Sequence, residues 1–370
     1  MDFDAQNFDY EAEFQKIKET VAKPNILVTG ATGAGKSSLI NHLFGEDTAP
    51  VGEGRPVTKG ILPYSSPNLS VNLYDSQGYE IDDCNENYEY RNNILGFIDE
   101  RKRSGDIETH IHEVWHCVSA SGKRVTDMDI DIIGEIKERN LPVAVVFTQI
   151  DGVDEAELSA LVGRVEEACE GVVHFAVCCA KDEEVQNRLK GYLQWTELLD
   201  WATANLDDAL REGFISSLKG SLNEKRDLAL GKIIPIYTAI ASGVGAVPIP
   251  FSDMFALIPL QVKMSMHIMN TYGLDNMSGV TSRAIESFAV SQIGRLIART
   301  LASNLLKLIP VAGAVVRGAV NATVAGAFTN AMGKAVCELG YRYVYDTVVE
   351  GKKTPLPEAF TSTALIDSMF

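Results

Sequence analysis

The sequence lacks the features that would tie its fold to disulfides or to a structural zinc ion. Its 370 residues include only six cysteines, none of them in a CxxC spacing, and we expect no signal peptide before them. A chain of this length buries a large core without covalent links, so the cysteine pattern indicates a reducing, cytoplasmic compartment. Hydrophobic residues make up 46% of the chain and charged residues 22%, which excludes a disordered protein.

Basic residues are scarce in the first half of the chain. The net charge is −17, from 33 Lys and Arg against 50 Asp and Glu. Residues 1–200 carry 18 basic and 37 acidic side chains, a balance of −19, whereas residues 201–370 carry 15 and 13, a balance of +2. Because nucleic-acid backbones are bound through Lys and Arg, the acidic half argues against a nucleic-acid partner. The asymmetry predicts two domains with different surroundings.

The hydrophobic pattern changes near residue 206. Before it, strand-like and helix-like segments alternate, and strands such as VAVVF are apolar on both faces, which is typical of a parallel sheet covered by helices on both sides. We therefore expect an α/β domain with a mostly parallel six-stranded sheet over residues 25–206. A second, all-α, Gly/Ala-rich domain is expected over 207–350. An N-terminal helix within 1–24 should pack on that second domain, and 351–370 should form an irregular tail.

The elements expected in the first domain follow from this patterning. The strands are Ile26–Thr29, Ile61–Ser65, Val71–Tyr74, Glu113–Ser119, Val143–Thr148 and Val172–Cys179. The helices are Lys36–Phe44, Tyr88–Arg103, Asp127–Arg139, Glu155–Glu170 and Tyr192–Leu206. A further amphipathic helix is expected over Asp207–Leu230.

The motif GATGAGKSS lies between strand NILVT and helix KSSLINHLF and fits the pattern GxxxxGK[ST]. Glycines let the loop turn tightly, so that successive N–H groups point at phosphate oxygens. Lys36 would reach the β- and γ-phosphates, and the Ser37 hydroxyl would ligate Mg²⁺. The residues expected to surround the phosphates are Gly30, Ala31, Thr32, Gly33, Ala34, Gly35, Lys36, Ser37 and Ser38.

A second motif, DSQG, follows strand VNLY. Asp75 can hold Mg²⁺ through water, and the Gly78 N–H can sense a γ-phosphate. Thr58, in the upstream segment RPVTKGI, could close on Mg²⁺ and the γ-phosphate when a triphosphate is bound. The expected metal-binding residues are Ser37, Thr58 and Asp75, and the expected catalytic residues are Lys36, Thr58, Gln77 and Gly78.

Two further motifs indicate that the base is guanine. In TQID, the Asp151 carboxylate could accept hydrogen bonds from guanine N1–H and the exocyclic amine, a donor pair that adenine lacks. Gln149 stands where [NT]KxD patterns carry lysine. In the segment Cys179-Ala180-Lys181, the Ala180 N–H would meet guanine O6. The residues expected at the base are Thr148, Gln149, Asp151, Ala180 and Lys181, with GTP and GDP as nucleotides and Mg²⁺ as the metal.

Together, GATGAGKSSLIN, VTKGI, DSQG, TQID and CAK resemble the motifs of a GTPase of the translation-factor-related class over roughly residues 25–205. The P-loop with Thr32 and Gly33 is most similar to the immunity-related and dynamin-like groups. The apolar segments Pro248–Leu274 and Leu308–Gly333 are similar to those of YcjF-like GTPases. That resemblance implies a helical, membrane-associating domain after the G domain.

The position after DSQG, where many small GTPases carry a water-orienting Gln, is Tyr79. Slow intrinsic hydrolysis is therefore expected, with Gln77 as a weaker candidate for orienting the water. The missing catalytic group could come from Arg55, from a second copy of the chain in a nucleotide-dependent homodimer, or from a partner. We expect slow basal turnover that rises with protein concentration or lipid.

The apolar second half allows three interpretations. Ile233–Ser252 contains no charge, but prolines interrupt it, and Arg317 lies within the second stretch. The stretches could form a buried hairpin, dock reversibly on lipid, or span a membrane. The function expected is a switch or mechanochemical GTPase at or near a membrane. The alternatives are a soluble regulatory GTPase that recruits a protein, and a membrane-perturbing effector gated by nucleotide.

Overall fold

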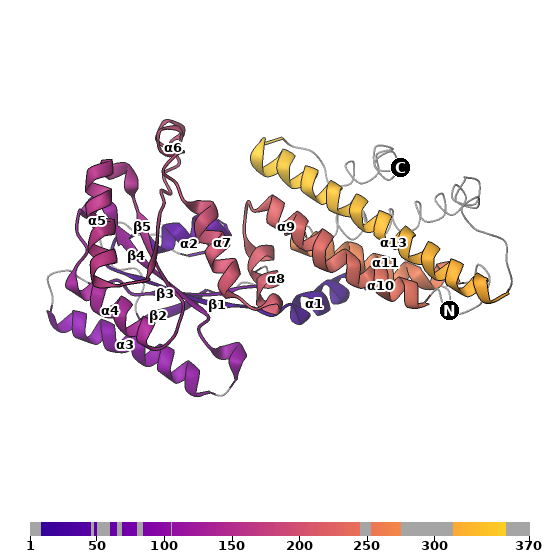
Figure 1. Cartoon of the computed structure of the whole chain (residues 1–370), viewed down its shortest axis with the longest axis horizontal. Coiled ribbons are helices and arrows are strands. Elements are labelled where there is room, and N and C mark those ends of the chain that lie inside the picture. Colours follow the sequence, from indigo (N-terminus) through magenta and orange to yellow (C-terminus); the bar gives the residue numbers. More distant parts are fainter. Residues whose placement is uncertain are drawn as a thin grey trace. The chain divides into compact units, whose positions relative to one another are not determined.

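A six-stranded sheet forms the centre of the compact unit Val21–Lys219 (Figure 1). The computed structural model describes residues 9–45, 48–49, 60–64, 69–79, 84–104, 106–244, 253–274 and 314–352. In spatial order the strands are β2 (Ile61–Tyr64), β3 (Asn72–Ser76), β1 (Asn25–Gly30), β4 (Glu113–Ser119), β5 (Val143–Thr148) and β6 (Val173–Ala176). β2 is antiparallel to β3, and the remaining neighbours are parallel. The predicted α/β fold with a mostly parallel six-stranded sheet is confirmed.

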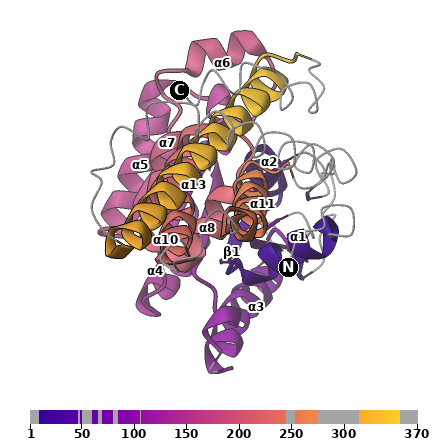
Figure 2. The same ribbon diagram turned by 90° about the vertical axis from the view of Figure 1, so that its right-hand side faces the viewer.

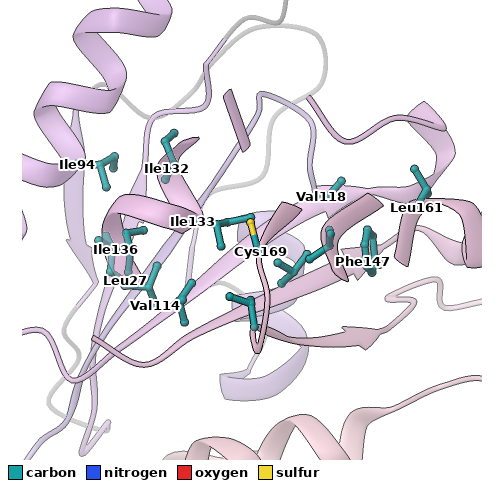
Figure 3. Packing of buried hydrophobic residues seen from close by; sticks show 14 of the residues in the cluster. Leu27, Ile94, Val114, Val118, Ile132, Ile133, Ile136, Phe147, Leu161 and Cys169 are labelled. Atoms are coloured by element: carbon teal, nitrogen blue, oxygen red, sulfur yellow. The ribbon is translucent and has the colours of Figure 1, made fainter. Parts of the chain in front are cut away.

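One face of the sheet packs against a layer of helices (Figure 3). Leu27, Val114 and Phe147 point from β1, β4 and β5 toward this layer, where Ile94 and Ile132 meet them. All five side chains are almost fully buried. The helices of the layer are α3 (Cys84–Arg103), α4 (Asp127–Glu138) and α5 (Glu155–Ala168).

The opposite face carries the alternate residues of the same strands, because side chains along a strand point to opposite sides. Ile26, Val28 and Trp115 lie here, packed with Leu39 and Phe214. The helices of this layer are α2 (Lys36–Phe44), α7 (Trp195–Asn205) and α8 (Asp208–Ser217). Helices on both faces explain why the central strands are apolar throughout.

Several elements differ from the expected ones. β6 ends at Ala176, three residues before the expected Cys179, and a short helix, α6 (Glu183–Leu189), follows where no helix was expected. The Asp182 side chain caps α6 by accepting from the N–H groups of Glu184 and Val185. The formation of such a short helix depends on its cap and not on a periodic apolar face. The periodicity of the sequence therefore does not predict it.

The second compact unit joins the N-terminal helix to helices from the end of the chain. Phe14 and Ile17 are buried with Val262 and Met264 in one apolar cluster, and Glu13 pairs with Lys263 at 2.6 Å. Helix α13 runs alongside α10 in both views (Figures 1 and 2). The elements are α1 (Tyr10–Thr20), α9 (Leu222–Leu228), a π-helical turn η4 (Ala229–Ile233), α10 (Ile234–Val244), α11 (Asp253–Thr271), α13 (Ala314–Val344) and a second π-helical turn η6 (Tyr345–Val349).

The division between the units falls after Thr20 and after Lys219, whereas the sequence suggested residues 24 and 206. The segment expected as one helix over Asp207–Leu230 is two, α8 and α9. α8 belongs with the sheet because Phe214 is fully buried against it. Among the described residues, no helix is both long and apolar enough to cross a membrane. Residues 353–370 of the expected tail and parts of both apolar stretches lie outside the described residues.

Candidate nucleotide-binding site

The loop between β1 and α2 makes the tight turn that phosphate binding requires. Gly30, Gly33 and Gly35 have positive φ angles of 136°, 77° and 79°. A Cβ on Gly30 would lie 2.2 Å from the carbonyl oxygen of Cys117, so only glycine fits there. Gly35 is the N-cap of α2 and provides no side-chain cap. The first N–H groups of α2 are therefore available to an anion.

Lys36 is fixed inside this loop. Its ammonium donates to the carbonyl oxygens of Gly30 at 3.0 Å and Ala31 at 2.9 Å, and only 7% of the residue is exposed. Burial lowers the pKa of Lys36, an effect that the neighbouring Asp75 opposes. An ammonium has three donors, and the two carbonyls take two of them. The third is suited to a phosphate oxygen.

Ser37 and Asp75 form a pair with the chemistry of a Mg²⁺ site. The Ser37 hydroxyl donates to Asp75 Oδ2 at 2.8 Å, while Asp75 Oδ1 is buried and has no hydrogen-bond partner among the described residues. Burial raises the pKa of Asp75, and Lys36 and Ser37 act in the opposite direction. Hydroxyl and carboxylate oxygens are the ligands that Mg²⁺ takes, so the two residues fit this ion. When bound with nucleotide, the ion neutralises phosphate charge.

The segment around Gln77 is joined to the start of β2. The Gln77 N–H donates to the Gly60 carbonyl at 2.6 Å, and the Gly60 N–H donates to Gln77 Oε1 at 2.9 Å. Gly60 comes two residues after Thr58, which lies outside the described residues, as does Arg55. The Gln77 carboxamide is thus engaged in holding the segment that follows Thr58.

The DSQG segment also contacts the P-loop directly. The Thr32 N–H donates to the Tyr79 carbonyl at 3.0 Å. A Cβ built on Gly78 would lie 2.4 Å from the Thr32 nitrogen and 2.6 Å from its hydroxyl oxygen. Real Cβ atoms do not approach this closely, so glycine is required at position 78.

The Tyr79 side chain points into the protein core. Its hydroxyl donates to Asp129 Oδ1 at 2.5 Å. His116 Nε2 lies 2.8 Å from the same oxygen, and His116 Nδ1 lies 2.9 Å from the Thr29 hydroxyl. Asp129 Oδ2 accepts from the N–H and hydroxyl of Thr126. The network joins β1, β4 and α4 beneath the DSQG segment, and it holds Tyr79 away from the position of a water-orienting side chain.

His110, His112 and His116 have a spacing that suggests a metal site. Within the described ranges, no group of three or more His, Cys, Asp or Glu could hold a metal ion. His116 instead belongs to the Asp129 network, and His112 Nδ1 accepts from the Asn25 N–H at 2.9 Å. His116 and His112 therefore hydrogen-bond to neighbouring segments of the α/β unit.

Thr148 and Gln149 support the P-loop from the end of β5. Thr148 donates to the Ala34 carbonyl at 2.7 Å, and Gln149 Nε2 donates to the Gly33 carbonyl at 3.1 Å. Gln149 Oε1 accepts from the hydroxyls of Ser119 at 2.6 Å and Ser121 at 2.7 Å. These serines fix which end of the amide faces the P-loop, because only the amide nitrogen can donate to a carbonyl.

Asp151 is exposed, in the position expected for contact with a base. Its Oδ1 accepts from the Cys178 thiol at 3.2 Å, and burial raises the pKa of that thiol. The Ala180 carbonyl accepts from Gln186 Nε2 at 2.7 Å, and Lys181 is exposed. Among the described residues, Cys178 is therefore a contact of the Asp151 carboxylate, and it lies one position before the predicted Cys-Ala-Lys segment.

The fold brings the sequence motifs to one edge of the sheet. The P-loop, DSQG, TQID and the Cys-Ala-Lys segment follow β1, β3, β5 and β6. Parallel strands end on the same side, and ligands of open α/β sheets bind there. Sequence reasoning missed Asp129, Ser119, Ser121 and the contact of Cys178. For Asp129, the sequence did contain a signal: Thr126 and Asp129 have the spacing of a capping box, and the Asp129 carboxylate does cap α4.

The fold and site define a P-loop nucleotide-binding domain. Residues 25–149 match the family model described as 50S ribosome-binding GTPase. The probable GTP-binding protein EngB of Wolbachia sp. (subsp. Brugia malayi, strain TRS) is 28% identical over 159 residues, which are 42% of this chain and 77% of that protein. The chain is similar to these GTPases over the domain that holds the motifs.

Solved structures with similarity to this chain were also found. A probable GTP-binding protein engB aligns over 45% of this chain and 95% of its own, at 15% identity and a TM-score of 0.33. Toc33 from Arabidopsis thaliana in complex with Mg²⁺ and GMPPNP aligns over 57% of this chain and 95% of its own, at 15% identity and a TM-score of 0.36.

The motifs, their geometry and the family match identify a P-loop GTPase domain within the chain. Such a domain binds GTP and GDP and hydrolyses GTP to GDP and phosphate, which is the nucleotide cycle of a switch.

Proposed function

We propose that this GTPase is a switch that controls the action of its helical unit at or near a membrane. The supporting observation is the set of hydrogen bonds that joins three nucleotide-sensing segments: Thr32 to Tyr79, and Gln77 to Gly60. A γ-phosphate that engages one segment would act on the others through these bonds. The α/β domain would sense the nucleotide, and the helical domain, with the N-terminal helix, would carry the output.

The site residues have the following proposed roles. Lys36 binds the β- and γ-phosphates, Ser37 and Asp75 hold Mg²⁺ with Thr58, and the Gly78 N–H meets the γ-phosphate. Gln77 couples the Thr58 segment to DSQG. Thr148 and Gln149 support the P-loop, Asp151 reads guanine, and the Ala180 N–H meets O6 beside Lys181.

The guanine assignment is tested by Asp151→Asn. An amide in place of the carboxylate cannot accept both guanine donors, but it can donate to the extra carbonyl of xanthine. We expect the preference to shift from GTP toward xanthosine triphosphate, measured by competition against a fluorescent GDP. Asp154→Asn, at the cap of α5, is the matched control. Unchanged GTP selectivity in the Asp151 variant would contradict the assignment.

The proposed membrane contact is supported by the surface of α10. Ile236 and Ile240 lie one helical turn apart and are 49% and 47% exposed. The half of the chain that contains them has a charge balance of +2, against −19 for the half with the nucleotide motifs, so it approaches anionic lipid more readily. We propose peripheral attachment from the cytoplasm through this unit, in the manner of YcjF-like proteins.

Flotation with phosphatidylserine-containing liposomes, in GDP and in a GTP analogue, tests this contact. Nucleotide-dependent flotation that Ile236→Ser/Ile240→Ser abolishes supports it, with the exposed Val348→Ser as control. Absence of flotation with either nucleotide would favour a regulator that recruits a protein. Release of dye from the liposomes would favour a membrane-perturbing effector.

We also propose slow basal turnover and a nucleotide-dependent homodimer, as in immunity-related and dynamin-like GTPases. Tyr79 is held by Asp129, so the usual water-orienting glutamine has no counterpart at that position. An arginine supplied in trans raises hydrolysis by about 10³–10⁵ in other GTPases, and a second copy of the chain could supply one. Turnover per molecule should rise with protein concentration, and light scattering should show a dimer with the GTP analogue. A high rate independent of concentration would contradict this.

A further inference from the structure

Strands β1 and β3 diverge at the edge of the sheet where the nucleotide is expected. Residues Asn25–Val28 of β1 pair in parallel with Asn72–Asp75 of β3. Beyond these pairs, β1 leads into the P-loop and β3 leads into the rest of the DSQG motif. Ligands of such sheets bind outside the carboxyl ends of the strands. The separation of the two segments therefore determines how closely the Gly78 N–H can approach a γ-phosphate.

A tyrosine of α3 bridges the two segments where they diverge. The phenol oxygen of Tyr90 accepts from the Gly30 N–H at 3.0 Å and forms a hydrogen bond with the Ser76 hydroxyl, also at 3.0 Å. Gly30 is the first residue of the P-loop, and Ser76 is the second residue of DSQG. Burial raises the pKa of Tyr90, so the phenol stays protonated and can donate as well as accept. One hydroxyl thus connects both segments just beyond the last paired residues, Val28 and Asp75.

A second contact joins the same segments further along the chain. The Thr32 N–H donates to the Tyr79 carbonyl at 3.0 Å. The rings of Tyr79 and Tyr90 lie 5.2 Å apart between their centroids, with an angle of 47° between their planes. Tyr90 therefore supports this second contact by packing, in addition to the bridge that its hydroxyl makes.

We propose that Tyr90 is a positioning residue for GTP hydrolysis. Its hydroxyl holds the P-loop and the DSQG segment at the separation that lets the Gly78 N–H meet the γ-phosphate. Tyr90 acts through Gly30 and Ser76, and we assign it no contact with the nucleotide. Small displacements matter at such a site, because a misplacement of about 1 Å can lower a rate by about 10²-fold. This role rests on the GTP hydrolysis assigned to the domain above.

The experiment compares Tyr90→Phe, Ser76→Ala and the double variant in the full-length protein. Phenylalanine keeps the ring and removes only the hydroxyl, whereas alanine removes the other side chain of the bridge. The rate of single-turnover GTP hydrolysis is measured for each, together with the affinities for fluorescent GDP and for a fluorescent, non-hydrolysable GTP analogue. Tyr88→Phe is the matched control, because Tyr88 lies on the same helix and is 65% exposed.

We expect Tyr90→Phe to hydrolyse GTP about tenfold more slowly and to bind the GTP analogue about tenfold more weakly, the order of effect of one hydrogen bond. Its affinity for GDP should stay within about twofold of the wild type, because GDP has no γ-phosphate for Gly78 to meet. Ser76→Ala should act in the same way. The double variant should be no more than about twofold slower than Tyr90→Phe, because both changes break one bridge.

Three outcomes would overturn the role of Tyr90. The first is a Tyr90→Phe variant with the rate of the wild type or of Tyr88→Phe. The second is an equal loss of affinity for GDP and for the GTP analogue, which a purely structural role would produce. The third is a double variant in which the two losses of rate multiply, since Tyr90 and Ser76 would then act independently.

Failure of the GTPase assignment gives a different result. A wild-type protein that does not hydrolyse GTP would overturn the activity itself. The ratio of the affinities for GDP and the GTP analogue would still test Tyr90, because that ratio needs no hydrolysis. An unchanged ratio in Tyr90→Phe would then overturn the bridge as well.

Discussion

Asp129→Asn tests the buried network that anchors Tyr79. The Asp129 carboxylate accepts from His116, from Tyr79, and from both the N–H and hydroxyl of Thr126, at distances from 2.5 to 2.8 Å. An asparagine side chain has only one acceptor oxygen. Its NH₂ group would therefore face either the donors of Tyr79 and His116 or the two donors of Thr126, and these would lose their acceptor. Only 3% of Asp129 is exposed, so water cannot replace the lost acceptor.

The expected cost follows from these contacts. A hydrogen bond to a charged group contributes about 1.5–3 kcal/mol, and a buried donor left unpaired costs about 1–3 kcal/mol. The two terms overlap, and we expect a loss of about 3 kcal/mol in the free energy of unfolding. In a domain of this size, that corresponds to a decrease of about 6–12 °C in Tm.

Urea unfolding followed by tryptophan fluorescence measures this loss. Trp115, Trp195 and Trp201 are all the tryptophans of the chain and lie in the α/β unit, so the signal reports on that unit. Asp131→Asn, exposed on the same helix, is the control and should change the free energy by no more than about 0.5 kcal/mol. Equal effects of the two variants would refute the reasoning.

A pH series adds a second test of the same residue. Burial alone would raise the pKa of Asp129, but hydrogen bonds from His116, Tyr79 and Thr126 outweigh it and hold the pKa below its ordinary value. The carboxylate thus contributes its full stability above about pH 4, the range of an unfolded aspartate, and loses it as pH falls further. The stability gap between wild type and Asp129→Asn should shrink below pH 4. A gap that stays constant down to pH 3 would contradict this assignment.

Two further predictions concern other buried groups. Burial raises the pKa of Glu113 to about 8, and the hydrogen bond from Trp115 partly opposes this effect. The folded protein therefore keeps a proton on Glu113 that the unfolded chain releases above about pH 4.3. As a result, the free energy of unfolding of the wild type falls as pH rises toward 8. Glu113→Gln, which mimics the protonated acid, should be more stable than wild type at pH 8 and nearly equal at pH 4 in the same urea assay, and a variant less stable at pH 8 would show that the carboxyl is ionised. Gln149→Glu would place an acceptor opposite the Gly33 carbonyl, so the affinity for fluorescent GDP should fall about tenfold. Gln149→Lys restores a donor and should keep the wild-type affinity. Equal affinities of the two variants would show that this contact is unimportant.

Much of the fold follows from local patterns. VAVVF and the strand before the P-loop are apolar on both faces, and such strands occur in parallel sheets covered by helices. The Lys36–Phe44 helix begins and ends where the sequence predicts. Helix α6 and the early end of β6 were not predictable in this way, because a cap at Asp182 and packing at the sheet edge decide them.

The interpretation of Tyr79 shows where sequence reasoning stops. Its position after DSQG identifies a missing glutamine, but not the direction of the side chain. That direction depends on Asp129, which lies 50 residues away in the chain, and on His116 in another strand. Ser119 and Ser121 likewise orient Gln149 across separate loops. Such contacts arise only once distant segments are brought together.

By itself, the sequence determined the class of the protein. The P-loop motif consists of a strand, a glycine-rich loop and a helix that begins with Lys36 and Ser37. Local interactions determine these elements, because each residue acts through its own backbone or through near neighbours. The tertiary structure decided which hydroxyls and carboxylates are paired. The Asp129 carboxylate makes four hydrogen bonds, whereas Thr32 Oγ1 and Asp75 Oδ1 have no hydrogen-bond partner among the described residues. Pairing depends on the three-dimensional meeting of β1, β3, β4 and α4, a property that no local spacing encodes.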